Sequence, residues 1–193
     1  ALLNNEKGLH IDKDHFMTIS PDEGSMNRAI YLANVLGVDM GMYYKRLDYS
    51  RYVNGRHPIA AYEFLGPKIE GKDMILIDDM ISSGDTIIKI ASLLKEKGAG
   101  RVYICSTFGF FTDGLDKFDD AYKKGYFDKL LTTNLVYQSP ELLEKPYYIS
   151  CDMSKYIALI IDTLNHDTSV SHLLNPVDRI KRCVTNYMSQ HEK

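Results

Sequence analysis

The stretch "MILIDDMISSGDT", residues 74–86, decides the fold of this chain. The apolar run "MILID", residues 74–78, predicts a buried strand, and "TIIKIASLLKEKG", from Thr86 to Gly98, predicts a helix that ends at glycine. Two adjacent carboxylates and a turn of Ser, Gly and Asp stand between the two elements. The stretch therefore predicts a strand–turn–helix unit whose turn carries polar chemistry.

The turn of this unit predicts a phosphate site. Backbone N–H groups without intrahelical partners, the helix dipole and hydroxyl side chains all favour an anion at a helix N-terminus. Gly84 permits close approach of the backbone. Asp78 and Asp79 would repel a phosphate in direct contact, but they suit neutral donors such as ribose hydroxyls, or a cation. These residues indicate a ribose 5-phosphate, and the alternative is an acid pair that only favours the helix dipole.

The rest of the chain predicts an α/β fold. Apolar strands are expected at 16–20, 38–44, 74–78, 101–107, 129–134 and 146–150, and helices at 26–37, 86–98, 114–126, 153–167 and 177–193. Residues 45–58 and 168–176 are expected to be loops. Apolar strands that alternate with helices are typical of a parallel β-sheet flanked by helices on both faces, and ligands bind beyond the carboxyl ends of such strands.

Length and composition exclude several classes of protein. The 193 residues suit one domain, 1–193, with 177–193 as a C-terminal helical extension. A net charge of −3 gives no basic surface for nucleic acid, and no apolar run approaches the ~18 residues that a membrane span needs. Cys105, Cys151 and Cys183 are widely spaced, form no zinc motif and predict reduced thiols. We expect a cytoplasmic protein with no secretory signal.

Five phrases in register show a resemblance to a known family. They are "ISPDEGSMNRAIYLANVLG" (19–37), "YYKRLDYS" (43–50), "MILIDDMISSGDT" (74–86), "LLTTNLVY" (130–137) and "TSVSHLL" (168–174). Together they resemble the ribose-phosphate pyrophosphokinases, which have a type I phosphoribosyltransferase fold, over about residues 11–176.

The resemblance implies a role for each matching residue. Asp78 and Asp79 would hold the ribose hydroxyls, and Asp22 would bind Mg²⁺. Lys45 and Arg46 would be the catalytic cations on the phosphates of ATP. The ribose 5-phosphate would be cradled by Ser82, Ser83, Gly84, Asp85 and Thr86. A regulatory phosphate would bind at Ser169 and Ser171.

The implied reaction is Mg²⁺-dependent transfer of diphosphate from ATP to the C1 hydroxyl of ribose 5-phosphate. Its products are phosphoribosyl diphosphate (PRPP) and AMP, for nucleotide biosynthesis. Positioning and positive charge on the phosphates would supply most of the catalysis. The family also implies a homo-oligomer, either a dimer or a hexamer.

Three departures from the family pattern leave alternatives open. Leu47 stands where the family has a catalytic arginine, and Arg46, Arg51 and Arg56 are the candidate substitutes. Ser82 stands where a carboxylate is common. The chain resembles only the second of the family's two domains, so we expect a fragment that is inactive alone. The alternatives are a non-catalytic regulatory homologue, which Leu47 favours, and a phosphoribosyltransferase that uses PRPP.

Simpler explanations also exist for single residues. Asp22 suits a turn after proline, Lys45 suits a solvated loop, and Ser169 and Ser171 suit the ends of helices. The segment "DKFDDAYKK", residues 116–124, suits a solvated helix face.

Overall fold

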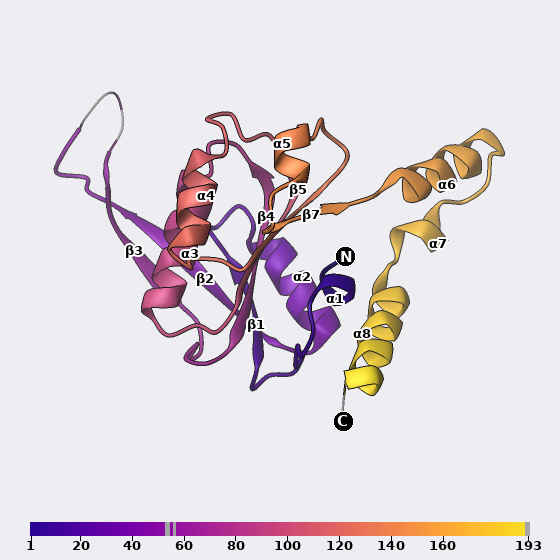
Figure 1. Cartoon of the computed structure of the whole chain (residues 1–193), viewed down its shortest axis with the longest axis horizontal. Coiled ribbons are helices and arrows are strands. Elements are labelled where there is room, and N and C mark those ends of the chain that lie inside the picture. Colours follow the sequence, from indigo (N-terminus) through magenta and orange to yellow (C-terminus); the bar gives the residue numbers. More distant parts are fainter. Residues whose placement is uncertain (53–54, 56, 192–193) are drawn as a thin grey trace.

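The computed structural model describes residues 1–52, 55 and 57–191, and a seven-stranded sheet forms its centre (Figure 1). The strands lie in the order β3-β2-β1-β4-β5-β6-β7, and every neighbouring pair is parallel except β2 with β3. Their bounds are Phe16–Ser20 (β1), Asp39–Leu47 (β2), Ile59–Leu65 (β3), Asp73–Ile81 (β4), Val102–Gly109 (β5), Lys129–Thr133 (β6) and Tyr148–Cys151 (β7).

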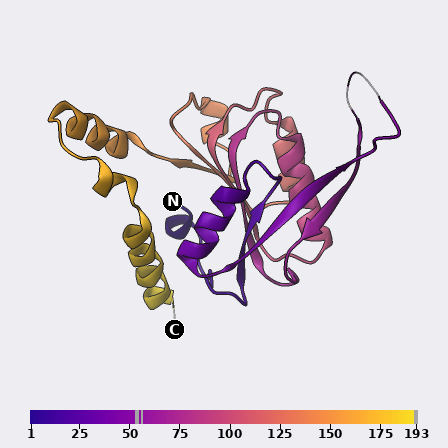
Figure 2. The ribbon, with the colours of Figure 1, turned by 180° about the vertical axis from the view of Figure 1, so that it is seen from behind.

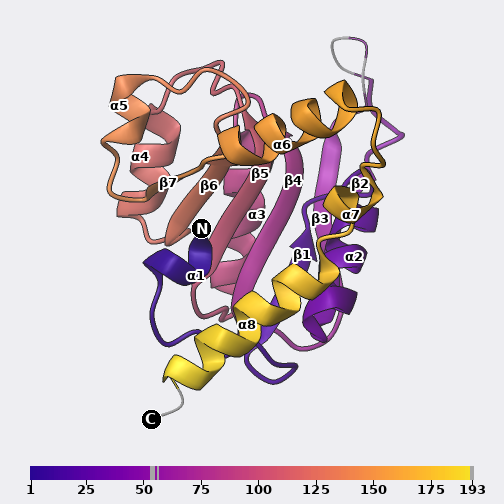
Figure 3. The same ribbon diagram turned by 90° about the vertical axis from the view of Figure 1, so that its right-hand side faces the viewer.

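Helices cover both faces of this sheet. Figure 3 shows α3 and α4 behind the sheet, with α1, α2 and α8 on the opposite side. The helix bounds are Leu2–Asn5 (α1), Met26–Leu36 (α2), Asp85–Glu96 (α3), Asp116–Lys123 (α4), Pro140–Leu143 (α5), Ser154–Asn165 (α6), Ser171–Leu174 (α7) and Val177–His191 (α8). The predicted α/β class with a helix-flanked sheet is confirmed, and the sheet is mostly rather than wholly parallel.

Two apolar clusters hold the layers together, one on each face of the sheet. Ile87, Ile90 and Leu94 of α3 join Phe118 of α4 in the larger cluster. The smaller cluster contains Ala33 of α2 and Tyr187 of α8. The tyrosine hydroxyl donates to the carbonyl of residue 6 at 2.9 Å and accepts from the N–H of residue 9 at 3.0 Å. Burial of apolar side chains on both faces explains why the strands read as continuous apolar runs.

The ribbon formed by β2 and β3 corrects the predicted loop over residues 45–58. Strand β2 continues through Lys45 to Leu47, and β3 pairs with it in the antiparallel direction. Figure 2 shows the ribbon extending beyond the rest of the sheet. Several of its side chains, among them that of Glu63, are exposed. Backbone pairing keeps these polar residues in a strand, although their sequence shows no strand pattern. Arg56 lies outside the described residues.

The C-terminal part forms an arm beside the sheet (Figure 1). Helix α6 confirms the predicted apolar helix, but its apolar side chains are largely exposed, with Ile161 at 62% and Leu164 at 59% of full exposure. The predicted loop 168–176 contains the short helix α7, and α8 confirms the predicted final helix as far as His191.

Two predictions from composition can be compared with the structure. All three cysteines are free thiols, and burial raises the pKa of Cys105 to about 12, which makes this thiol unreactive. Within the described ranges, no helix combines the length and the apolar character that a transmembrane segment requires.

Candidate functional site

Two turns meet at one edge of the sheet. Strands β1 and β4 are parallel neighbours, with Ile19 opposite Leu76, so the turns that follow them leave the sheet on the same edge. The first turn carries Asp22, and the second carries residues 82–86. Both turns line one cavity of about 160 Å³. The structure thus brings together Asp22, Asp78 and residues 82–86 at one cavity.

Residues Ser82 to Thr86 line this cavity, and the last two of them begin α3. Gly84 precedes the helix with φ +85°, and no side chain caps the helix. The N–H of Asp85 donates only weakly, to Ser83 Oγ at 3.5 Å. The first turn of α3 therefore keeps N–H groups for a ligand, and the positive end of the helix dipole lies at the cavity. A Cβ atom on Gly84 would lie 2.2 Å from the ring of Phe118. Both the backbone angle and the packing require glycine here.

Asp85, at the start of α3, is held by a lysine from a neighbouring helix. Lys117 of α4 donates to its Oδ1 at 2.8 Å and to Asp113 at the same distance. The hydrogen bonds from Lys117 and Ser83 lower the pKa of Asp85. The charged pattern of residues 116–124 predicts a solvated helix face for Lys117, and no sequence signal marks its contact with Asp85.

Both acids of the pair lie inside β4 rather than at its end. The sequence predicted a strand that stops at Asp78, but β4 continues to Ile81 because β5 keeps pairing with it. Met80 lies opposite Phe108, and Ile81 lies opposite Gly109.

The two carboxylates face different surroundings. Asp78 is half-buried and lines the cavity, where its Oδ1 accepts from Ser25 Oγ at 2.7 Å and from the N–H of Asp79 at 2.8 Å. Burial raises the pKa of Asp78 more than these hydrogen bonds lower it. Asp79 lies outside the cavity lining, and its Oδ2 accepts from Arg28 at 3.2 Å. Burial alone would raise the pKa of Asp79, but its hydrogen bonds and the positive charge of Arg28 lower it overall.

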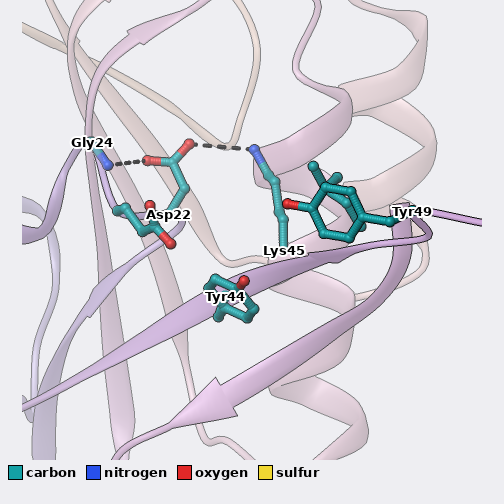
Figure 4. Close-up of a pocket in the computed structure, with 7 residues that line it drawn as sticks. Asp22, Gly24, Tyr44, Lys45 and Tyr49 are labelled. Carbon is teal, nitrogen blue, oxygen red and sulfur yellow. Dashed lines mark hydrogen bonds and ion pairs between the residues drawn. The ribbon is translucent and has the colours of Figure 1, made fainter. Parts of the chain in front are cut away.

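A second cavity, of about 420 Å³, adjoins the first at Asp22 (Figure 4). Lys45 of β2 points at Asp22, with Nζ 3.3 Å from Oδ2. Leu47 also lines this cavity, together with Tyr44 of the same strand. Arg46 is not among the lining residues, and its Nε lies 2.8 Å from Glu63 of β3. The structure brings Lys45 to the site and does not bring Arg46 there.

The other candidate substitutes for the family arginine give no support. Arg51 lies beyond the end of β2, is exposed, and is not among the residues that line the second cavity. Arg56 belongs to the residues that the structure does not describe. Leu47 therefore contributes an apolar side chain where the resemblance leads us to expect a cation.

Asp22 has the chemistry that a magnesium ion requires. Mg²⁺ in phosphate-transfer sites binds through one or two carboxylates, with waters and substrate phosphates completing its shell. The Asp22 side chain is 37% exposed and lines both cavities, and its Oδ2 already faces a cationic group, Lys45 Nζ. Among the described residues, no group of three or more His, Cys, Asp or Glu forms a protein-only metal cage. The Asp22 carboxylate offers oxygen ligands of the kind that Mg²⁺ prefers in proteins.

Ser25 and Arg28 were missed by the sequence analysis, although both contact the acid pair. Both belong to the beginning of α2, immediately after the turn that carries Asp22. Both lie inside the matched phrase of residues 19–37, but this is a weak signal, because only the parallel pairing of β1 with β4 brings them to the acids.

Ser169 lies between α6 and α7, and Ser171 is the first residue of α7. The arm that carries both serines lies on the side of the molecule away from the β2–β3 ribbon (Figure 1). Their hydroxyl oxygens are 2.9 Å apart, and the N–H of Ser171 donates to Ser169 Oγ at 3.3 Å. This contact suits a local turn. A role in binding a regulatory phosphate stays a prediction.

Comparison with known proteins gives relatives over most of the chain. The family model described as the phosphoribosyl synthetase-associated domain matches residues 56–175. A ribose-phosphate pyrophosphokinase of Vibrio parahaemolyticus is 29% identical over 163 residues, which are 84% of this chain and 49% of the relative. One of Thermococcus kodakarensis is 31% identical over 121 residues, or 62% of this chain and 39% of the relative.

A solved structure shares the fold. The phosphoribosylpyrophosphate synthetase from Mycobacterium smegmatis superposes with a TM-score of 0.65 and 24% identity, over 79% of this chain and 45% of that one. The chain thus spans about half the length of the relatives that it matches. The family match over more than half of the chain, the curated relatives and the shared fold agree, and the chain belongs to the phosphoribosylpyrophosphate synthetase family.

Proposed function

We propose that this chain is the ribose 5-phosphate-binding half of a ribose-phosphate pyrophosphokinase. One observation carries the proposal. The N-terminus of α3 and the carboxylate of Asp78 line a single small cavity. N–H groups that can bind a phosphate therefore lie beside a carboxylate that can accept hydrogen bonds from hydroxyls. A sugar phosphate is the ligand class that uses both.

In this proposal, residues Ser82 to Thr86 bind the 5-phosphate through backbone N–H groups and hydroxyls. Asp78 accepts hydrogen bonds from the ribose hydroxyls, and Asp79 supports it from the side of α2. The anomeric end of the sugar then faces Asp22 and the second cavity, in which Lys45 stands. Lys45 offers positive charge to the phosphates that are transferred, and a preorganised cation stabilises charge in the transition state.

Asp22 would hold Mg²⁺ in the loaded site, and the ion would neutralise phosphate charge and orient the transferred group. Lys45 Nζ lies 3.3 Å from the same carboxylate, so the lysine would add positive charge for the phosphates on the Asp22 side of the cavity.

Diphosphate transfer from ATP is proposed for the whole protein rather than for this half alone, since the chain spans about half the length of its relatives. We further propose a cytoplasmic homo-oligomer. The exposed apolar side chains of α6, including Leu159, Ile161 and Leu164, support the assembly, because exposed apolar patches mark interaction surfaces.

A second candidate function is that of a non-catalytic regulatory homologue, and Leu47 favours it. This side chain shares the face of Lys45 in the second cavity, and an apolar group cannot stabilise phosphate charge. Loss of an arginine aimed at a transferring phosphate costs about 10³–10⁵ in rate in related chemistry.

One experiment separates the two functions. The natural full-length protein is incubated with Mg²⁺, ATP and ribose 5-phosphate, and AMP and PRPP are followed by ³¹P NMR. Product formation by the native protein supports the enzyme. No product from the native protein and none from Leu47→Arg, while ribose 5-phosphate still binds, supports the regulatory homologue. Absence of ribose 5-phosphate binding rejects both.

A further inference from the structure

Ser25 stands at the N-cap position of α2 but does not cap the helix. Serine is among the preferred N-cap residues because its hydroxyl usually accepts from the first N–H groups of the helix. Here the structure records no such bond, and the hydroxyl donates to Asp78 Oδ1 at 2.7 Å instead. Ser25 is only 2% exposed. A buried hydroxyl that gives up the local bond has its main interaction in the acid pair.

The bond fixes the orientation of one carboxylate. Asp78 Oδ1 receives two donors, Ser25 Oγ at 2.7 Å and the N–H of Asp79 at 2.8 Å. A carboxylate offers about four acceptor positions, so two donors on one oxygen set its plane and leave about two positions for a ligand. Asp78 lines the small cavity, so these positions serve a group bound there.

The turn before α2 holds Ser25 in place without using its hydroxyl. Asp22 Oδ1 accepts from the N–H of Gly24 at 3.0 Å and from the N–H of Ser25 at 3.3 Å. The backbone of Ser25 is therefore tied to the residue that lines both cavities, while its side chain is directed at Asp78. This arrangement links the position of Asp22 to that of Asp78 through one serine.

We propose that Ser25 is a positioning residue that sets ribose selectivity by aiming Asp78 at the sugar hydroxyls. The inference rests on the proposed function, because it takes ribose 5-phosphate as the ligand of the small cavity. It goes beyond that function in naming a residue, from a different strand–helix unit, that makes the site distinguish ribose from 2-deoxyribose. A carboxylate held in one orientation can accept hydrogen bonds from two vicinal hydroxyls at once, which favours ribose. A carboxylate without that restraint gains less from the second hydroxyl.

Arg28 makes the corresponding contact with the second acid but contributes less. Its Nη2 lies 3.2 Å from Asp79 Oδ2, and the two side chains are 45% and 43% exposed. Ion pairs this exposed are weak because water screens them. Asn27, between the two residues, is exposed and supplies a matched control from the same turn of α2.

The test measures three affinities by isothermal titration calorimetry on the full chain. The ligands are ribose 5-phosphate, 2-deoxyribose 5-phosphate and inorganic phosphate, and the proteins are the native chain, Ser25→Ala, Ser25→Thr and Asn27→Ala. We expect the native chain to prefer ribose 5-phosphate. We expect Ser25→Ala to bind ribose 5-phosphate about tenfold more weakly than the native chain, as for a lost hydrogen bond to a charged group. Phosphate affinity should stay within about twofold, since the phosphate turn is untouched.

The remaining variants make the result decisive. Ser25→Thr keeps the hydroxyl and should restore the preference for ribose, and Asn27→Ala should match the native chain. If Ser25→Ala does not fold, as judged by circular dichroism, Ser25→Cys replaces it, because a thiol keeps the volume but donates weakly. Equal loss for all three ligands, or an unchanged preference in the alanine variant, would overturn the role of Ser25. No binding of ribose 5-phosphate to the native chain would instead reject the proposed function.

Discussion

Gly84→Ala tests the phosphate turn, because two separate features of the structure forbid a side chain there. The backbone of Gly84 has φ +85°, and an alanine in that left-handed region costs ~1–2 kcal/mol. The new methyl would lie 2.2 Å from Phe118 Cζ, and overpacking of this kind costs ~1–3 kcal/mol. Phe118 is fully buried and packs edge-on against Phe111 at 5.2 Å, so its ring cannot move away freely. We expect a total destabilisation of about 2–5 kcal/mol.

Urea denaturation measures the free energy of unfolding, and Gly125→Ala is the matched control. Gly125 also has a left-handed φ, +72°, but nothing lies within 4 Å of a Cβ atom placed there. The control should lose only the backbone part, ~1–2 kcal/mol. Replacing the ring by Phe118→Leu in the Gly84→Ala background should recover part of the loss, as a negative coupling of about 1 kcal/mol or more. Equal losses at Gly84 and Gly125, with no coupling to Phe118, would refute the steric argument.

Three further predictions concern the acids and cations of the site. Burial raises the pKa of Asp78 in the folded chain, so the folded state binds the proton more tightly than the unfolded state, and stability falls as pH rises through the folded pKa. Asp78→Asn should therefore be more stable than the native chain at pH 7, and this difference in stability should shrink as pH falls toward the ordinary carboxyl range. The variant should also lose sugar binding. Thermal unfolding across pH checks the sign, and a variant less stable than the native chain at pH 7 contradicts it. Lys45→Ala should lower ATP-dependent turnover of the full-length protein by about 10²-fold or more, because it removes a group that stabilises phosphate charge. Arg46→Ala, which removes the partner of Glu63, should change turnover by less than about threefold. Equal effects of the two variants in a steady-state assay would show that both cations reach the substrate. Leu47→Arg should raise the affinity for inorganic diphosphate in calorimetry because it adds a cation to the face of Lys45; an unchanged affinity would show that this face does not meet the phosphates.

The parts of the fold that the sequence predicted are those in which local pattern and tertiary environment agree. Strand β1 and helices α2 and α3 show apolar periodicity and end where glycine or a turn ends them, and the structure has them within a residue or two of the predicted bounds. Strand β3 and the end of β2 were missed because polar side chains of the ribbon, such as those of Arg46 and Glu63, are exposed. The region therefore shows neither the apolar run nor the regular alternation of a buried strand.

The candidate site was predictable to the same extent. The turn 82–86 and the two acids could be predicted from residue type, since hydroxyls, glycine and carboxylates cluster in one short stretch. The contacts of Ser25 with Asp78 and of Lys117 with Asp85 depend on which strands are neighbours and on where a helix crosses. The pairing of Arg46 with Glu63 depends on the extension of β2 and its pairing with β3, which the predicted loop over residues 45–58 did not include.

A titration followed by ¹⁵N–¹H NMR tests whether ribose 5-phosphate binds in the small cavity at the turns that follow β1 and β4. We expect millimolar or tighter binding, with the largest shifts at the amides of residues 78–79 and 82–86 and small shifts in α8. Ribose without the phosphate should leave the amides of residues 82–86 nearly unchanged. Shifts that cluster elsewhere, or no shifts at ten millimolar ligand (roughly the limit of weak specific binding, about 3 kcal/mol), would contradict the account.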